Sequence, residues 1–201
     1  RQETAYGTLV DNPDTDGDGI EDGEEVNGTK TSPLLEDTDA DCLSDYEELY
    51  RTNTIPLEAN PGVCSSVSDP VSINTYARTS TYSGVTINDE DTTLYYATPG
   101  ESMTVSAGWN VKTPASTYCP GCFVQFYLGM SDVFSSCLYS GILEPGSNVS
   151  GRLGTTAFVA PEEPGVYYIT QQGSLQYSCV EVNHSSDPAK AIATVVVMAA
   201  E

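Results

Sequence analysis

Two acidic loops of the same design lie 23 residues apart near the start of the chain. Each has carboxylates at loop positions 1, 3, 5, 9 and 12; these are Asp14, Asp16, Asp18, Asp22 and Glu25, and then Asp37, Asp39, Asp41, Asp45 and Glu48. Carboxylate oxygens at this spacing suit a hard cation such as Ca2+, which takes about 6–8 oxygen ligands. The loops therefore predict at least two bound calcium ions.

The remaining loop positions support this interpretation. Position 7 gives a backbone carbonyl to such an ion, and here it is Ile20 or Leu43, whose apolar side chain can point away and pack. Position 6 favours glycine because the chain turns sharply there. Gly19 follows that rule and Cys42 departs from it. A merely solvated acidic run would not repeat five ligand positions in register.

The charge balance excludes several kinds of partner. The chain has 29 acidic and 7 basic residues, a net charge of −22. Fourteen of the acids lie in residues 14–48 with one base, Lys30, so bound cations would offset much of the excess. We expect no nucleic acid partner, because phosphates require Lys and Arg, and no anionic membrane surface. No stretch approaches the roughly 20 apolar residues that span a bilayer, so no membrane insertion is expected.

Other features favour an extracellular or cell-surface location. The sequence begins at Arg1 rather than Met, which suggests a processed product. Its six cysteines are an even number, and Asn27, Asn148 and Asn183 each open an N-x-Ser/Thr sequon for glycosylation. Together with calcium loops, these features are typical of an oxidising compartment.

Four segments can be separated along the chain. They are a leader at 1–10, the repeat module at 11–62, a Ser/Pro linker at 63–70 and a β-rich segment at 71–201. In the last segment, turn residues separate short alternating runs at intervals of about 10 residues, which is the pattern of an antiparallel sandwich. The fold class we predict is mostly β: a small calcium-loop repeat module followed by an antiparallel immunoglobulin-like β-sandwich.

The expected strands are rich in Val, Ile, Thr and Tyr. They span 72–77, 84–88, 93–97, 102–111, 123–129, 136–139, 149–151, 156–159, 166–171, 176–182 and 191–198. In the repeat module, a short helical stretch follows each loop, at 20–26 and at 43–50. So small a module cannot build a large apolar core, so its folding free energy should come largely from the bound ions.

Each loop has the pattern D-T-D-x-D-x-φ-x-D-x-E-E, where φ is an apolar residue, and a Pro-containing connector follows. This pattern resembles thrombospondin type 3 repeats, over about residues 11–61. It is also similar to the calcium loops of dockerins. The two helical stretches differ too much for a cohesin-facing pair, so the dockerin resemblance ranks second. The first resemblance implies that the ten carboxylates above are ligands, and that the module is a rigid, calcium-stiffened spacer.

The cysteines allow several arrangements. A bridge between Cys42 and Cys64 would tie the module to the linker. Cys119, Cys122, Cys137 and Cys179 could form two disulfides in any of three pairings. The Cys119-Pro-Gly-Cys122 motif also raises a redox pair or a zinc site. We favour disulfides, because a strand rather than a helix follows the motif and a second such motif is lacking.

The sequence gives little support for catalysis, so we expect no enzyme. The single histidine, His184, lies in a sequon and is expected to be an exposed loop residue. The acidic clusters at 89–91 and 162–163 lie beside turn residues, where solvated acids are common. Thirteen tyrosines leave sugar binding open, although Tyr167, Tyr168 and Tyr177 are expected to pack in strands.

The function predicted from these features is that of an extracellular calcium-binding structural protein, a subunit of a surface filament, fibril or adhesive stalk. Residues 4–10 make a plausible strand that could add to a sheet edge of a neighbouring copy, giving a head-to-tail filament. The competing possibility is that this strand pairs with its own sandwich. The alternative function is a carbohydrate-binding or adhesive accessory module of a larger secreted protein, with glycans as partners.

Overall fold

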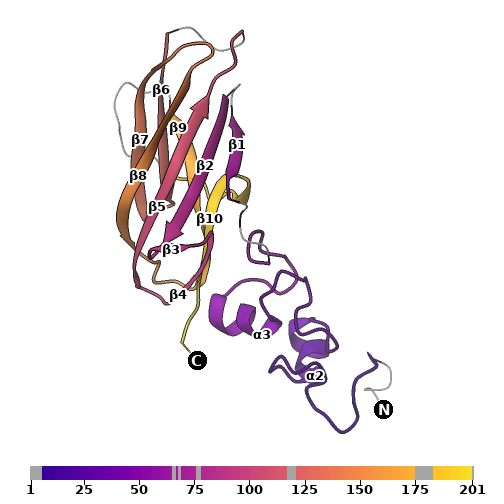
Figure 1. Cartoon of the computed structure of the whole chain (residues 1–201). Helices are drawn as coiled ribbons and strands as arrows, with labels where there is room; N and C mark the ends of the chain where they lie inside the picture. The colour runs from indigo at the N-terminus through magenta and orange to yellow at the C-terminus, as the bar shows by residue number, and fades with distance from the viewer. Residues whose placement is uncertain are drawn as a thin grey trace.

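The structure is a computed structural model that describes residues 6–64, 67, 69–75, 78–116, 121–174 and 183–200. Two regions succeed one another along an elongated molecule (Figure 1). The repeat module forms one end and the sandwich the other. The N-terminus lies at the far end of the module, whereas the C-terminus lies where the two regions meet.

Two five-stranded sheets form the sandwich. The first has the order β1-β2-β5-β8 with β3 also on β2, and comprises β1 (Val71–Thr75), β2 (Arg78–Ile87), β3 (Glu90–Asp91), β5 (Ser102–Lys112) and β8 (Asn148–Val159). The second has the order β4-β10-β9-β6-β7, and comprises β4 (Leu94–Ala97), β10 (Ala191–Val197), β9 (Gly165–Ser174), β6 (Cys122–Met130) and β7 (Phe134–Leu143). The chain crosses between sheets after β3, β4, β5, β7 and β8, and the two packed sheets are those of an immunoglobulin-like sandwich. The predicted fold class is confirmed.

Two details differ from the expected strands. β4 pairs with β10 in parallel, because the chain changes sheets before β4 and runs along β10 in the same direction. The separate strands expected at 149–151 and 156–159 are one strand, β8. A register shift opposite it, between Val105 and Ala107 of β5, accommodates the glycine-containing middle of β8. The strand expected at 176–182 lies outside the described residues.

The core lies between the two sheets and is almost wholly apolar. All seven residues of β10 are buried, and Phe126 of β6 is fully enclosed. Arg78 is an exception, with 6% of its surface exposed; its guanidinium lies 4.5 Å from the centre of the Phe126 ring. A cation over an aromatic face is stabilised by the ring quadrupole, which offsets part of the cost of burying the charge.

The repeat module consists of two units with the same backbone plan. The first has α2 (Asp22–Glu24), which continues as the π-helical turn η1 (Glu25–Thr29), and the second has α3 (Asp45–Glu47) and η2 (Glu48–Thr52). A short 3-10 helix, η3 (Pro188–Lys190), precedes β10. Among the described residues, no helix has the length and apolar character needed to cross a membrane.

The leader does not form a strand where it is described. Residues 6–10 pack on the first loop, and the Leu9 backbone N–H donates to Thr15 Oγ1 at 2.9 Å. In the second unit, the Ser32 N–H donates to Thr38 Oγ1 at 2.9 Å in the same way. Leu9 therefore belongs to the repeat, and these residues are not paired with the sandwich of their own chain. Residues 1–5 lie outside the described part.

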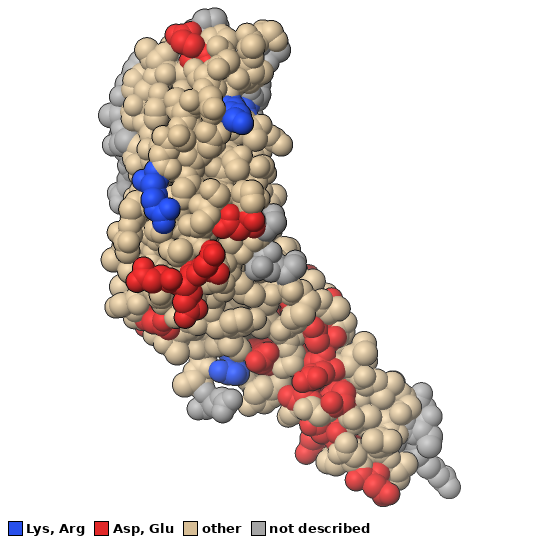
Figure 2. Space-filling model, in the orientation of Figure 1, with Lys and Arg blue, Asp and Glu red and all other residues tan. Residues whose placement is uncertain are grey.

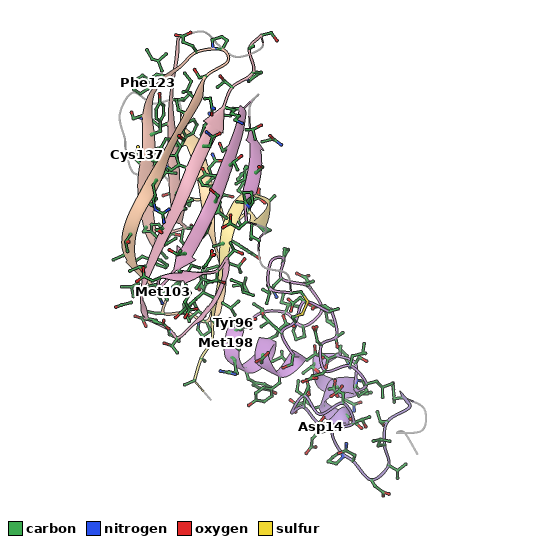
Figure 3. The ribbon with its side chains drawn as sticks, viewed as in Figure 1. Asp14, Tyr96, Met103, Phe123, Cys137 and Met198 are labelled. Carbon is green, nitrogen blue, oxygen red and sulfur yellow. A yellow bond between two sulfur atoms is a disulfide. The ribbon has the colours of Figure 1, made fainter. Side chains whose placement is uncertain are left out.

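The module meets the sandwich through an apolar cluster and a backbone hydrogen bond. Leu43 and Val63 of the module pack with Val196 of β10, and the half-buried Leu94, Val166 and Met198 surround them. Beyond β10, the Ala199 N–H donates to the Arg51 carbonyl at 2.8 Å. Figure 3 shows Tyr96 and Met198 at the end of the sandwich that faces α3. We call these contacts the joint.

Candidate metal centres in the acidic loops

The backbone of each loop turns where the sequence pattern requires. Positions 4 and 6 are left-handed in both loops, with φ of 86° and 107° at Gly17 and Gly19, and 62° and 74° at Ala40 and Cys42. Non-glycine residues reach this region at a cost of about 1–2 kcal/mol. The position-1 aspartate stabilises the turn, because Asp37 accepts from the N–H groups of Ala40 and Cys42 at 2.7 Å.

The carboxylates at positions 1, 3 and 5 converge in both loops. In each triad, one ligand oxygen per residue lies within 4.8 Å of the others; the triads are Asp14, Asp16 and Asp18, and Asp37, Asp39 and Asp41. The position-12 residues, Glu25 and Glu48, are fully buried and interact electrostatically with aspartates of their own triads. Each triad could hold a metal ion. Figure 2 shows acidic side chains gathered along the repeat module.

Several of these oxygens are buried without a hydrogen-bond donor. They are Asp16 Oδ2, Asp18 Oδ2, Glu25 Oε2, both carboxylate oxygens of Asp39 and Glu48 Oε2. A buried, unpaired carboxylate is costly, because it has lost its hydration and gained no partner. All six atoms are acceptors, so water or a backbone amide could satisfy some of them, whereas a single cation in each loop would satisfy them together. The donor set contains oxygen only, which suits a hard divalent ion.

The electrostatics agree with this geometry. Burial, together with repulsion from neighbouring aspartates, raises the pKa of Glu25 to about 7 and that of Asp39 to about 6. Burial raises the pKa of Glu48 to about 8, although the Thr54 hydroxyl opposes this by hydrogen bonding to the carboxylate. Raised pKa values of clustered acids indicate a site that lacks positive charge, which a bound cation would supply.

The position-9 aspartates, which are predicted ligands, also hold their loops closed. Asp22 accepts from the Thr15 N–H and hydroxyl, both at 2.8 Å. Asp45 accepts from the Thr38 N–H at 2.9 Å and from its hydroxyl at 2.6 Å. Each carboxylate thus binds the position-2 threonine with both oxygens and holds the loop closed.

The position-7 side chains pack inward. Ile20 is 2% exposed and Leu43 is 1% exposed. Leu43 is part of the joint, and Ile20 is among the few apolar residues buried in the module. Side chains turned inward in this way leave the backbone carbonyls of position 7 as the candidate ligands.

Asn60 contacts two acids of the second loop, which the sequence analysis did not anticipate. Its backbone N–H and its side-chain amide donate to Asp41 Oδ2 at 2.6 and 2.8 Å, and the amide also donates to Glu48 Oε1 at 3.1 Å. A signal was available: Asn60 lies 23 residues after Asp37, as Asp37 lies 23 after Asp14. Asn60 thus occupies position 1 of a third, truncated repeat.

Cys42 and Cys64 form a disulfide with an S–S distance of 2.05 Å. It ties the turn of the second loop to the segment that enters the joint. Cys137 is also disulfide-bonded. The pairing among Cys119, Cys122, Cys137 and Cys179 lies outside the described residues, and so does the choice between disulfides, a redox pair and zinc at Cys119 and Cys122.

The three sequon asparagines, Asn27, Asn148 and Asn183, are all exposed. Two of their side chains make hydrogen bonds at the surface: Asn27 Nδ2 donates to the Gly23 carbonyl at 2.8 Å, and Asn148 Oδ1 accepts from Asn110 at 2.7 Å. Exposure of this kind leaves room for an attached glycan.

His184 was expected to be exposed, and this was wrong. It is 5% exposed and lies against Gly129, with Nε2 at 3.0 Å from Ser135 Oγ. A glycine at position 129 makes room for the ring, a tertiary effect that no local pattern indicates. Burial lowers the pKa of His184. The acidic cluster at 89–91 lies at the surface, as expected.

Comparison with known proteins adds little. No protein-family profile matches the chain, and no curated protein matches it in sequence. A solved structure named "Biofilm associated protein - BSP domain" is similar at 14% identity and a TM-score of 0.23, over 92% of this chain and 37% of that one. A TM-score of this size is too low to indicate shared function. The resemblance to thrombospondin type 3 repeats therefore rests on the loop pattern alone.

Proposed function

We propose that the chain is an extracellular calcium-binding structural protein, in which two ions stiffen the repeat module. The observation that carries this proposal is the set of buried carboxylate oxygens without donors, in the same two loops that repeat the ligand spacing. The Cys42–Cys64 disulfide supports an oxidising, extracellular setting.

Calcium fits the loops better than magnesium does. Mg2+ demands near-ideal octahedral geometry and keeps several of its waters, whereas Ca2+ accepts many protein oxygens in irregular geometry. Each loop offers a triad of aspartates and one fully buried glutamate, an almost all-protein set of ligands. The fully buried Glu25 and Glu48 leave little room for waters on that side of the ion.

Calcium titration by calorimetry tests this assignment. We expect two binding events for the full chain, and loss of one event in each of Glu25→Gln and Glu48→Gln, with an affinity loss of about 100-fold. Glu58→Gln changes an exposed acid of the same module and is the matched control, with both events retained. Absence of binding by the unaltered chain, or binding of magnesium in preference, would contradict the proposal.

We further propose that copies of the chain assemble through the leader, residues 1–10. Tyr6, Leu9 and Val10 are 52%, 56% and 67% exposed, which leaves apolar surface for a neighbouring copy to cover. The sandwich offers open sheet edges, among them the 12-residue strand β8, which ends its sheet. A long unprotected edge strand is prone to pair with another chain.

Light scattering and negative-stain imaging test assembly directly. We expect polymers in calcium that dissociate or soften in chelator, and a monomer when residues 1–10 are deleted. The control is a double substitution in β3, Glu90→Gln with Asp91→Asn, which alters exposed acids of the sandwich and should leave polymers intact. If the deletion left polymers unchanged, the leader would have no part in assembly.

Glycan binding is the second candidate function, and it has one observation in its favour. Tyr46 and Tyr50 are exposed, with ring centres 4.9 Å apart. An open polar pocket of about 460 Å3, lined in part by Tyr46 and Arg51, lies between the two loops. Exposed aromatic rings can stack on sugars. A glycan array with the unaltered chain and with Tyr46→Ala tests this candidate; a glycan bound by the former and lost by the latter would support it.

A further inference from the structure

The two metal centres share their loops but differ in what closes them. In both, a threonine hydroxyl donates to the buried glutamate, Thr31 to Glu25 at 3.1 Å and Thr54 to Glu48 at 3.0 Å. Only the second has an amide side chain from outside its loop on two of its acids. The corresponding position after the first loop is Asp37, an acid that heads the next loop.

Asn60 begins the segment that runs into the sandwich. Tyr168 of β9 donates its hydroxyl to the Pro61 carbonyl at 3.0 Å. Gly62 lies so close to Thr194 of β10 that an added Cβ would be 2.7 Å from its Oγ1. Val63 then packs against Val196 in the joint. Asn60 and the three residues after it therefore connect the acids of the second centre to β9 and β10.

Two more connections start from the second loop itself. Leu43, at position 7, is a member of the joint cluster, so the residue whose carbonyl is the candidate ligand has its side chain against the sandwich. Glu48 begins η2, and Arg51 of η2 accepts from the Ala199 N–H at 2.8 Å. The first unit lies farther from the sandwich, as α2 does in Figure 1.

We propose that Asn60 is part of the second metal centre, and that a cation bound there fixes the joint between the repeat module and the sandwich. The first centre stiffens only the module. This inference rests on the proposed metal binding. A cation would order Asp39, Asp41 and Glu48 together, and through Asn60, Leu43 and η2 it would order the residues that contact β9 and β10.

Amide hydrogen exchange, followed by NMR on the full chain, measures the stability of the joint through the exchange rate of a single backbone N–H. The Ala199 N–H reports on the joint, the Gly19 and Cys42 N–H groups report on the two loops, and the Val195 N–H of β10 reports on folding of the sandwich. Asp16→Asn and Asp39→Asn are matched variants, because each changes position 3 of one loop.

The proposal predicts that calcium slows exchange at Ala199 in the unaltered chain. With calcium present, Asp39→Asn should speed that exchange about 10-fold, and Asp16→Asn should leave it within about twofold. Asn60→Ala should speed exchange at Ala199 as well, when measured at a calcium concentration high enough to keep the Cys42 N–H protected. Throughout, an unchanged Val195 shows that the sandwich is folded.

Other outcomes separate the two proposals. If calcium protected neither Gly19 nor Cys42 in the unaltered chain, metal binding itself would fail. If calcium protected both loops but left Ala199 unchanged, metal binding would stand and the coupling to the joint would be overturned. Equal effects of Asp16→Asn and Asp39→Asn at Ala199, or no effect of Asn60→Ala, would also overturn it.

Discussion

The sandwich and the repeat module bury opposite kinds of side chain. The sandwich encloses a continuous apolar core that includes Phe126, Leu128 and Ile169, together with Ile192, Ala193, Val195 and Val197 of β10. In the module and at its junction with the sandwich, the buried residues include the acids Asp22, Glu25, Asp41, Asp45 and Glu48. The apolar residues Ile20, Leu43 and Val63 are buried there as well. One region is stabilised by removing apolar surface from water, and the other requires a partner for its buried charge.

This difference shows how two neighbouring regions of one chain can respond to separate conditions. A hydrophobic core is nearly independent of calcium and of pH between the ordinary pKa values of acids and bases. A cluster of carboxylates is sensitive to both, because protons and cations compete for the same oxygens.

Calcium removal should separate the regions most strongly. Each occupied centre adds about 4 kcal/mol of stability when free calcium is about 1,000 times its dissociation constant. We expect chelator to abolish exchange protection in the module, and to leave β5, β6 and β10 protected. Calorimetry with and without chelator should show one transition that depends on calcium and one that does not. A single transition that shifts as a whole would contradict this separation.

A cavity in the sandwich should have the converse effect. Phe126 is fully buried, stacks on Tyr139 with ring centres 5.6 Å apart and lies under Arg78. We expect Phe126→Ala to destabilise the sandwich by about 3–5 kcal/mol. Chemical denaturation measures this loss, and calcium calorimetry of the same variant should give unchanged affinity for the first centre. A weaker first centre would show that the two regions are not independent.

The pH dependence of the module should change sign with calcium. Without metal, burial raises the pKa of Glu25 to about 7 and that of Glu48 to about 8, from ordinary values near 4.5. Their protonated forms are favoured in the fold, so this stability is complete below about pH 4 and is lost as the pH rises through 7 to 8. Calcium requires the ionised forms, so its affinity should rise over the same window.

Tyrosine circular dichroism between about pH 4 and pH 9, with chelator and with calcium, measures both trends. In chelator we expect order in the module to decrease as the pH rises. In saturating calcium we expect it to be retained at high pH and lost on acidification. The same slope in both conditions would mean that protons and calcium do not compete for these carboxylates.

The position-2 threonines should give the smallest effect. Thr15→Val and Thr38→Val keep the side-chain shape but remove a hydroxyl that donates to the position-9 aspartate. The same hydroxyl accepts from the N–H of Leu9 or of Ser32, and that bond is lost as well. A ligand-supporting contact of this kind contributes about 10-fold in metal affinity. Calorimetry should show that loss in the altered loop and not in its neighbour. If Thr38→Val weakened calcium binding as much as Glu48→Gln does, the Thr38 hydroxyl would contribute far more than a supporting contact.

Local patterns anticipated the sandwich and the loops because both depend on near neighbours. Alternating β-branched residues and turn dipeptides predicted most strands from β2 to β10, and the carboxylate spacing predicted the two triads. The same patterns misjudged His184, whose burial depends on Gly129 some 55 residues earlier in the chain. They also gave no sign that Thr15 binds both oxygens of Asp22, because spacing alone does not reveal this contact.

By itself, the sequence determined the repeat of 23 residues, the converging aspartates and the all-oxygen chemistry of each centre, since these follow from spacing along one loop. Only the tertiary structure decided how the centres differ. Asn60 reaches Asp41 across 19 residues, and Leu43 meets Val196 of β10 from the other end of the chain. Such contacts form because apolar surface and buried charge both need partners, which folding supplies from distant positions.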